Sequence, residues 1–142
     1  MRKIALLLAT AGALVATAVS LAGTQSMGWS ASLTSGKEVP KQAVKVPNAT
    51  GKFTATVSGN TLKWKLTFAK LSGPATAAHI HIGAMGKAGG VIVALCGPCK
   101  SGASGSAPLT AALKKDVVKH LLYVNVHTAK NPAGEIRGQI TG

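Results

Sequence analysis

The sequence has few acidic residues and few aromatic ones. Among 142 residues only three are Asp or Glu, against 16 Lys and Arg, and the aromatic residues are two Trp, one Tyr and two Phe. A pair of carboxylates for glycoside hydrolysis is not expected, because Asp116 falls in a helical pattern and Glu38 in a loop pattern. A nucleic-acid-binding protein usually clusters its positive charge and adds arginines and exposed aromatic side chains. We therefore expect no nucleic-acid partner.

Long apolar runs are also scarce, since the sequence has only one, at its start. Arg2 and Lys3 precede an uncharged stretch at 4–19, and Ser20-Leu21-Ala22 follows. This order of a positive segment, an apolar segment and a small-x-small site predicts a secretory signal peptide. We expect cleavage after Ala22, with Ala18 as the second choice. An uncleaved membrane anchor is less favoured, because polar and glycine residues interrupt the run.

Cleavage divides the sequence into a signal peptide at 1–22, a flexible lead-in at 23–28 and one domain at 29–142. The mature chain is expected to be secreted, periplasmic or held at the cell envelope, with no transmembrane segment. Its 120 residues suffice for one hydrophobic core. They carry 14 basic residues against three acidic ones, a formal charge of +11 that favours association with anionic surfaces.

Thirteen of those 14 basic residues are lysines spread along the chain. Such lysines also solubilise strand faces and protect sheet edges, which is the alternative to a dedicated polyanion site. The candidate partners are therefore anionic polymers of the cell envelope or another exported protein.

Apolar and polar residues alternate through most of the domain, as in strands with one buried face. Segments 53–57 and 62–68, joined by Ser58-Gly59-Asn60, are predicted to form a β-hairpin. Further strands are predicted at 29–34, 76–82, 91–95, 122–127 and 135–140, with a short one indicated within 100–107. Leu109 to Leu121 is the only candidate helix. About seven or more short antiparallel strands with one short helix predict a mainly all-β fold, a Greek-key β-sandwich.

Three of the four histidines fall on predicted strands. His79 and His81 are two residues apart, so their side chains share one strand face, and His127 ends another strand. If the two strands are neighbours, three imidazoles can bind one copper or zinc ion. Alternatively, the three side chains hydrogen-bond to nearby polar groups and hold the edge of the sandwich together. His120 is expected at the surface.

Four residues near these strands are expected to support the histidine cluster. They are Tyr123, Asn125, Glu135 and Arg137. Glu135 and Arg137 share a strand face and are candidates for an ion pair. No catalytic residue is assigned.

The only two cysteines lie in the tetrapeptide Cys96-Gly97-Pro98-Cys99. The same tetrapeptide is the active site of thioredoxin, where a helix N-terminus lowers the pKa of the first thiol. Here Lys100-Ser101-Gly102 follows instead of an amphipathic helix. In an exported chain the expected state is a disulfide between Cys96 and Cys99. Thiolate binding of a soft ion such as Cu(I) and redox activity stay open as alternatives.

Three motifs occur in the order found in a known family. They are Ser58-Gly59-Asn60-Thr61-Leu62, Ala78-His79-Ile80-His81, and Tyr123-Val124-Asn125-Val126-His127-Thr128 followed by Pro132-Ala133-Gly134-Glu135-Ile136-Arg137-Gly138-Gln139. Together they resemble the CHRD (chordin-type) domain over residues 29–140. The resemblance implies a secreted or cell-envelope β-sandwich, found in bacteria as a stand-alone exported domain and in animal chordin as a repeated module of a growth-factor-binding protein. The family has no generally assigned enzymatic activity.

The His-x-His strand is also similar to the copper-ligand strand of copper, zinc superoxide dismutase. Only His79 and His81 carry over, because the loop after His81 has no His, Asp or Glu for the zinc site. Superoxide dismutation by that mechanism is therefore not expected.

The sequence favours a non-enzymatic exported binding or interaction module of the CHRD type. A single copper or zinc site at His79, His81 and His127 is its candidate cofactor site. The alternative is a small secreted metalloenzyme or redox protein that uses these histidines or Cys96 and Cys99.

Overall fold

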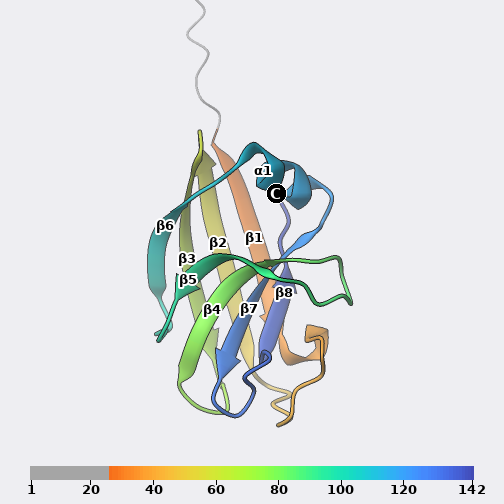
Figure 1. The fold of residues 1–142 in the computed structure, drawn as a ribbon. Coiled ribbons are helices and arrows are strands. Elements are labelled where there is room, and N and C mark those ends of the chain that lie inside the picture. Colours follow the sequence, from red (N-terminus) through yellow and green to blue (C-terminus); the bar gives the residue numbers. More distant parts are fainter. Residues whose placement is uncertain (1–25) are drawn as a thin grey trace, which may run out of the picture.

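Residues 26–142 of the computed structural model form eight antiparallel strands and one α-helix (Figure 1). The strands are β1 (Met27–Thr34), β2 (Thr50–Ser58), β3 (Thr61–Ala69), β4 (Ala75–Ile82), β5 (Val91–Cys96), β6 (Ala103–Pro108), β7 (Leu122–Thr128) and β8 (Ile136–Gln139). A 3-10 turn, η1 (Ser35–Lys37), follows β1, and the helix α1 (Ala111–Val118) connects β6 to β7. The predicted signal peptide at 1–22 lies outside the described residues. No helix within 26–142 combines the length and the apolar character that crossing a membrane requires.

All eight strands of residues 26–142 belong to one hydrogen-bonded sheet, in the order β5-β4-β7-β8-β1-β2-β3-β6. The predicted hairpin is β2–β3, and its register runs from Thr50 opposite Ala69 to Ser58 opposite Thr61. The two halves of the sheet meet at the β1–β8 pair, where Thr34 lies opposite Arg137. The sheet curls until its inner faces meet, so that it is nearly a closed barrel (Figure 1). The predicted all-β fold is confirmed, and its two layers are the halves of one curled sheet.

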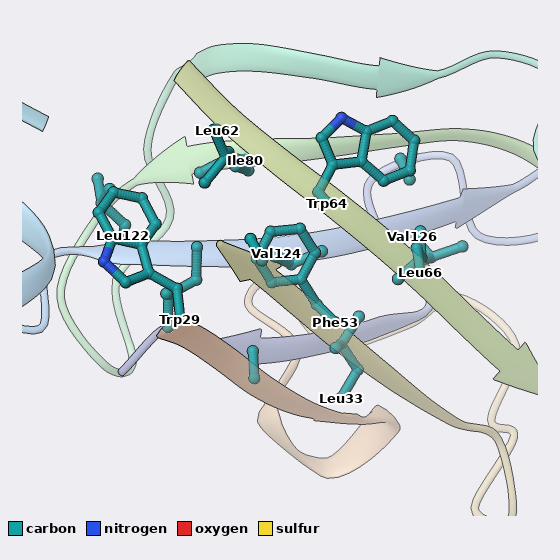
Figure 2. Packing of buried hydrophobic residues seen from close by; sticks show 14 of the residues in the cluster. Trp29, Leu33, Phe53, Leu62, Trp64, Leu66, Ile80, Leu122, Val124 and Val126 are labelled. Atoms are coloured by element: carbon teal, nitrogen blue, oxygen red, sulfur yellow. The ribbon is translucent and has the colours of Figure 1, made fainter. Parts of the chain in front are cut away.

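The hydrophobic core fills the space between these two halves (Figure 2). Its large members are Trp29, Leu33, Phe53, Leu62, Trp64 and Leu66 from β1 to β3, and Ile80, Leu122, Val124 and Val126 from β4 and β7. Buried and exposed residues alternate along β2 and β3, as the sequence pattern predicts. Burial of each large apolar side chain contributes about 1.5–3 kcal/mol. The contact between the inner faces is therefore what keeps the sheet curled.

Helix α1 is shorter than the predicted helix at 109–121. The Thr110 side chain caps its start by accepting a hydrogen bond from the backbone N–H of Leu113 (3.3 Å). The helix ends because His120 takes a left-handed conformation, with φ at 55°. Val117 is the buried residue of α1 and joins the core, whereas His120 is exposed as expected.

Two loops cover the outer face of β4, β7 and β8. In the first loop, at 35–48, Gln42 Nε2 donates a hydrogen bond to the carbonyl oxygen of Glu135 (2.8 Å). The second loop, at 83–90, is bound through Arg137 Nη2, which donates to the carbonyl oxygen of Ala84 (3.0 Å). As a result Tyr123 is buried although it points away from the hydrophobic core. This half of the sheet therefore has a buried polar layer on its outer side.

The two ends of the described chain lie close together. The C-terminal Gly142 approaches Trp29 near the start of β1, where an added Cβ atom would lie 2.7 Å from the ring atom Cδ1. Both ends are on the side of α1, and the 35–48 loop lies at the opposite end of the sheet (Figure 1).

Replacing Gly138 on β8 is predicted to destabilise the fold, because this residue lies against the backbone of β1. A Cβ atom there would lie 2.5 Å from the carbonyl oxygen and 2.8 Å from the carbonyl carbon of Ser32. Gly138→Ala is expected to lower the free energy of unfolding by about 1–3 kcal/mol in urea denaturation. The matched control is Gly28→Ala on β1, where an added Cβ meets nothing within 4 Å. Equal stability of the two variants would contradict this account of the β1–β8 contact.

Candidate metal centre

The structure brings His79, His81 and His127 together on the outer face of the sheet. Strands β4 and β7 are hydrogen-bonded neighbours, with His79 opposite Asn125 and Ala77 opposite His127. One ring nitrogen from each histidine lies within 4.8 Å of the others. The ring centroids are 4.9 Å apart for His79 and His127, 5.6 Å for His79 and His81, and 5.9 Å for His81 and His127. The three residues, here called the histidine cluster, therefore face one small volume.

Backbone carbonyls orient two rings of the histidine cluster. His81 Nδ1 is 3.0 Å from the carbonyl oxygen of Gly89, and His127 Nδ1 is 2.9 Å from that of Pro132. Since a carbonyl oxygen only accepts, Nδ1 carries the proton in both rings and Nε2 keeps its lone pair. His79 Nδ1 is 3.1 Å from His127 Nε2, and it is the donor of that pair. His81 Nε2 is buried and has no hydrogen-bond partner.

The spacing of the histidine cluster suits a metal ion after small side-chain movements. Zinc binds imidazole nitrogen at about 2.0–2.1 Å, which places the nitrogens of a tetrahedral site about 3.3 Å apart. His79 Nδ1 and His127 Nε2 are 3.1 Å apart, and one nitrogen from each of the three rings lies within 4.8 Å of the others. To bind an ion through Nδ1, His79 carries its proton on Nε2 instead. His81 is buried, whereas His79 and His127 are partly exposed. An ion held there would keep one side open to solvent.

The surroundings favour the neutral form of all three rings. Burial lowers the pKa of His79, and the neighbouring His127 and His81 lower it further. Burial also lowers the pKa of His81, and the charge of Arg137 adds to this against the effect of the Gly89 carbonyl. Burial is again the main reason why the pKa of His127 lies below its usual value. Neutral imidazole is the form that binds metal ions.

His81 belongs to a stack of three side chains. Its ring lies parallel to that of Tyr123, with centroids 4.9 Å apart and planes inclined by 9°. On Tyr123 the guanidinium carbon of Arg137 lies 3.4 Å from the ring centroid, a cation–π contact. Tyr123 Oη also accepts a hydrogen bond from the backbone N–H of Gly89 (3.1 Å). Tyr123 and Arg137, both expected to support the cluster, therefore position His81.

The backbone of Gly89 is hydrogen-bonded to both His81 and Tyr123, and only glycine fits at this position. A Cβ atom at Gly89 would lie 1.6 Å from the carbonyl oxygen of Ile82. Nothing in the sequence spacing distinguishes Gly89 from the other glycines of the 83–90 loop.

Asn125 is in contact with the carboxyl group of Glu38, a residue that the sequence pattern does not connect to the site. Asn125 Nδ2 donates a hydrogen bond to Oε1 of Glu38 (2.5 Å), and Glu38 is fully buried. The pair fits because residue 134 is glycine. Gly134 has φ at 136°, and an added Cβ atom would lie 2.3 Å from Asn125 Nδ2 and 2.5 Å from Glu38 Oε1. Glu38 lies in a loop, as the sequence pattern predicts, and it is buried because the 35–48 loop folds over the sheet.

The carboxylate of Glu135 is hydrogen-bonded to polar groups and does not form the expected ion pair with Arg137. Its carboxylate accepts hydrogen bonds from the Ser72 backbone N–H (2.6 Å), the Ser72 hydroxyl, Thr128 Oγ1 (2.6 Å) and Asn131 Nδ2 (2.9 Å). Burial raises the pKa of Glu135, but these hydrogen bonds outweigh it and hold the pKa below its usual range. Glu135 thus ties the β7–β8 turn to the segment before β4, while Arg137 packs on Tyr123.

Cys96 and Cys99 form the disulfide that the sequence predicts. The bond closes the end of β5, where the backbone N–H of Cys99 donates to the carbonyl oxygen of Ala75 (3.0 Å). Sulfurs bonded to each other are not thiolate ligands. In the described part of the chain, the group of side chains that can hold an ion contains His79, His81 and His127 and no cysteine.

A comparison with known families decides the identity of the fold. The model of the CHRD domain matches residues 29–140. The chain belongs to the CHRD family. Among curated proteins and among solved structures, nothing matches this chain. The resemblance carried by the three motifs is therefore confirmed, and the histidine cluster and its supporting residues all lie inside the CHRD domain. Membership indicates a non-enzymatic binding module in general, and CHRD domains are typically extracellular.

Glu38 is expected to make the stability of this CHRD domain fall as the pH rises. Burial raises the pKa of Glu38 from 4.5 to about 7, and the Val39 backbone N–H, Arg137 and Asn125 offset this only in part. The folded protein therefore holds a proton that the unfolded chain releases, so this stability is complete below pH 4.5 and is lost as the pH approaches 7. The loss is about 2–3 kcal/mol relative to a variant that cannot ionise.

Urea denaturation of the natural protein and of Glu38→Gln, at several pH values between about 4.5 and 8, measures this loss. The free energy of unfolding of the natural protein minus that of the variant should decrease with pH and level off near neutrality. Taking the difference cancels the titration of the histidines. Asp116→Asn, which removes a carboxyl group of α1, is the control. A pH-independent difference for Glu38→Gln would contradict the buried protonated carboxyl.

Proposed function

We propose that this protein is an exported binding module that holds one copper or zinc ion between His79, His81 and His127. The observation that carries the proposal is the convergence of three neutral imidazoles within 4.8 Å on one face of the sheet. Imidazole nitrogen is the ligand shared by protein zinc and copper sites.

The orientation of the rings supports a metal role over a purely structural one. The Nδ1–H groups of His81 and His127 are bound to backbone carbonyls, which is the arrangement that fixes a ligating histidine and directs Nε2 to the ion. His127 Nε2 accepts a hydrogen bond from His79 Nδ1, a bond that an ion would replace. His81 Nε2 instead is buried without a partner, which costs free energy that a metal bond would recover.

Three further features support export. Residues 1–22 have the pattern of a secretory signal peptide, the chain belongs to a typically extracellular family, and Cys96 and Cys99 form a disulfide, which persists in oxidising compartments. We infer that the mature domain acts in the periplasm, at the envelope or in the medium.

A metalloenzyme is the second candidate, since three histidines with an open side also form catalytic zinc sites. The partly exposed His79 and His127 are the observation in its favour. Against it, the buried carboxyls of this region are engaged elsewhere: Glu38 bonds to Asn125, and Glu135 to Ser72, Thr128 and Asn131. A general base beside the ion is therefore not among the described carboxyls, and we favour binding over catalysis.

Metal analysis of the purified protein tests the proposal. The full chain is expressed with its own N-terminus and purified from the periplasm or medium, and its recovery there also tests export. After incubation with Cu²⁺ or Zn²⁺ and desalting, about one ion per chain is expected. His79→Ala and His127→Ala should each lower the affinity by about 10–100-fold or more, because two imidazoles remain.

The matched control is His120→Ala, which removes an exposed histidine outside the cluster and should leave metal binding unchanged. Circular dichroism of each variant verifies that the fold is kept. Retention of no ion above background by the natural protein, or equal loss with His120→Ala, would refute a site at the histidine cluster.

For the partner of the module, we infer an anionic envelope polymer bound on the outer face of β1, β2, β3 and β6. The exposed side chains of that face are hydroxyls and ammonium groups: Ser30, Ser32, Thr54, Thr56, Thr67, Ser104 and Ser106 with Lys52, Lys63 and Lys65. No acidic residue of 26–142 lies on these strands, since Glu38 and Glu135 are buried in the other half and Asp116 is in α1. A shallow groove of about 470 Å³ runs between β2, β3 and β6, lined by Lys63 and Lys65.

Binding to dextran sulfate, with uncharged dextran as the reference, tests this lysine face. Retention should weaken sharply between about 0.05 and 0.5 M salt, because salt screens exposed charges. The triple variant Lys52→Gln, Lys63→Gln, Lys65→Gln should lose most of the affinity. A second triple variant, Lys45→Gln, Lys115→Gln, Lys130→Gln, has the same net charge and changes exposed lysines elsewhere. If both triple variants bind equally, the lysines act only through net charge and the face is not a site.

A further inference from the structure

A pocket lies over the outer face of β8, and none of its lining residues is a histidine. It has a volume of about 470 Å³ and lies between the 35–48 loop and the 83–90 loop. Arg137 and Gln139 of β8 line it, with Lys37, Val39 and Lys41 from the first loop and Met85 from the second. Its volume falls within the range of small-molecule sites.

The charge of this pocket has one sign. Lys37, Lys41 and Arg137 line it, and no acidic side chain does. Each lysine is held by one hydrogen bond, from Lys37 Nζ to the carbonyl oxygen of Ser32 (2.9 Å) and from Lys41 Nζ to that of Gly36 (2.9 Å). An ammonium group has three donors, so each lysine keeps two for a ligand.

Arg137 is short of hydrogen-bond partners. It is 1 % exposed, its Nη2 donates to the carbonyl oxygen of Ala84 (3.0 Å), and its Nη1 is buried with no partner. The nearby Glu38 directs Oε1 to Asn125, and its other oxygen also has no partner. Because burial raises the pKa of Glu38 to about 7, this carboxyl is protonated in a large part of the molecules at neutral pH. A buried guanidinium without a permanent counter-ion favours the binding of an anion.

We propose that this pocket binds a small organic carboxylate. The carboxylate lies between Arg137 and the ammonium groups of Lys37 and Lys41, and the hydrocarbon part packs against Val39 and Met85. A planar guanidinium matches a planar carboxylate. Apolar walls at Val39 and Met85 favour a ligand with a hydrocarbon body over a bare inorganic anion. No histidine lines the pocket, and its link to the proposed metal centre is Arg137, which packs on Tyr123 of the His81 stack.

Calorimetric titration of the natural protein with hexanoate tests the proposal, with hexanamide and inorganic phosphate as the comparison probes. Hexanoate is expected to bind with one site per chain. Hexanamide has the same hydrocarbon part without the charge, and phosphate has the charge without the hydrocarbon. Each should bind at least about tenfold more weakly, since one charge-assisted hydrogen bond accounts for a factor of that size.

The decisive variant is Lys37→Gln with Lys41→Gln, because both side chains are exposed and their loss should leave the fold intact. It should weaken hexanoate binding by about tenfold or more. Lys115→Gln with Lys130→Gln removes the same charge from exposed positions that do not line the pocket and should not change the affinity. Arg137→Lys, checked by circular dichroism, should weaken binding as well.

Three results would overturn the proposal. The first is that no hexanoate binds up to about 10 mM, a range that covers weak small-molecule sites. The others are equal binding of hexanoate and hexanamide, and equal hexanoate affinity of the two lysine double variants. Binding of phosphate alone would replace the carboxylate site with a simple anion site.

Discussion

Strands β7 and β8 are covered on both faces, and every candidate site described above except the lysine face depends on that constraint. The inner face packs into the hydrophobic core, and the outer face carries polar side chains that two loops cover. A buried polar group must be hydrogen-bonded or it destabilises the fold. Glu135 satisfies this rule with Ser72, Thr128 and Asn131. The same layer also contains His81 Nε2, Glu38 Oε2, Asn125 Oδ1 and Arg137 Nη1, all without partners. The proposed metal and carboxylate sites are argued from these unpaired groups of one layer.

The parts of the fold that follow from short-range pattern could be predicted from the sequence. The β2–β3 hairpin is an example. Apolar and polar residues alternate along strands that have one solvent-exposed face, and Ser58-Gly59-Asn60 marks the turn. Strand β6 and the true length of α1 are less visible, since the first is made of small polar residues and the second ends on the backbone conformation of His120. The CHRD motifs add identity to this pattern, and the family match confirms them.

The site could be predicted only as a list of residues. Whether His127 meets His79 and His81 depends on β7 pairing with β4, and three elements separate these strands along the chain. Spacing within a strand does not encode which strand becomes its neighbour. The burial of Glu38 could not be predicted for a similar reason. It depends on a loop that crosses a strand distant in the sequence and on the space left by Gly134. Arg137 has a clear partner in Tyr123, but a cation–π contact has no short sequence signature.

The closeness of the two ends of the described chain bears on how such a domain can be attached to other chains. Residue 27 begins β1 and Gly142 packs beside Trp29, so both connections leave from the side of α1. A unit with adjoining ends can be inserted into a surface loop of a host chain, or strung in tandem, without stretching its own backbone. Any such attachment leaves the 35–48 loop at the far end projecting outward. The placement of the ends of the described chain therefore allows modular reuse and leaves the far end accessible.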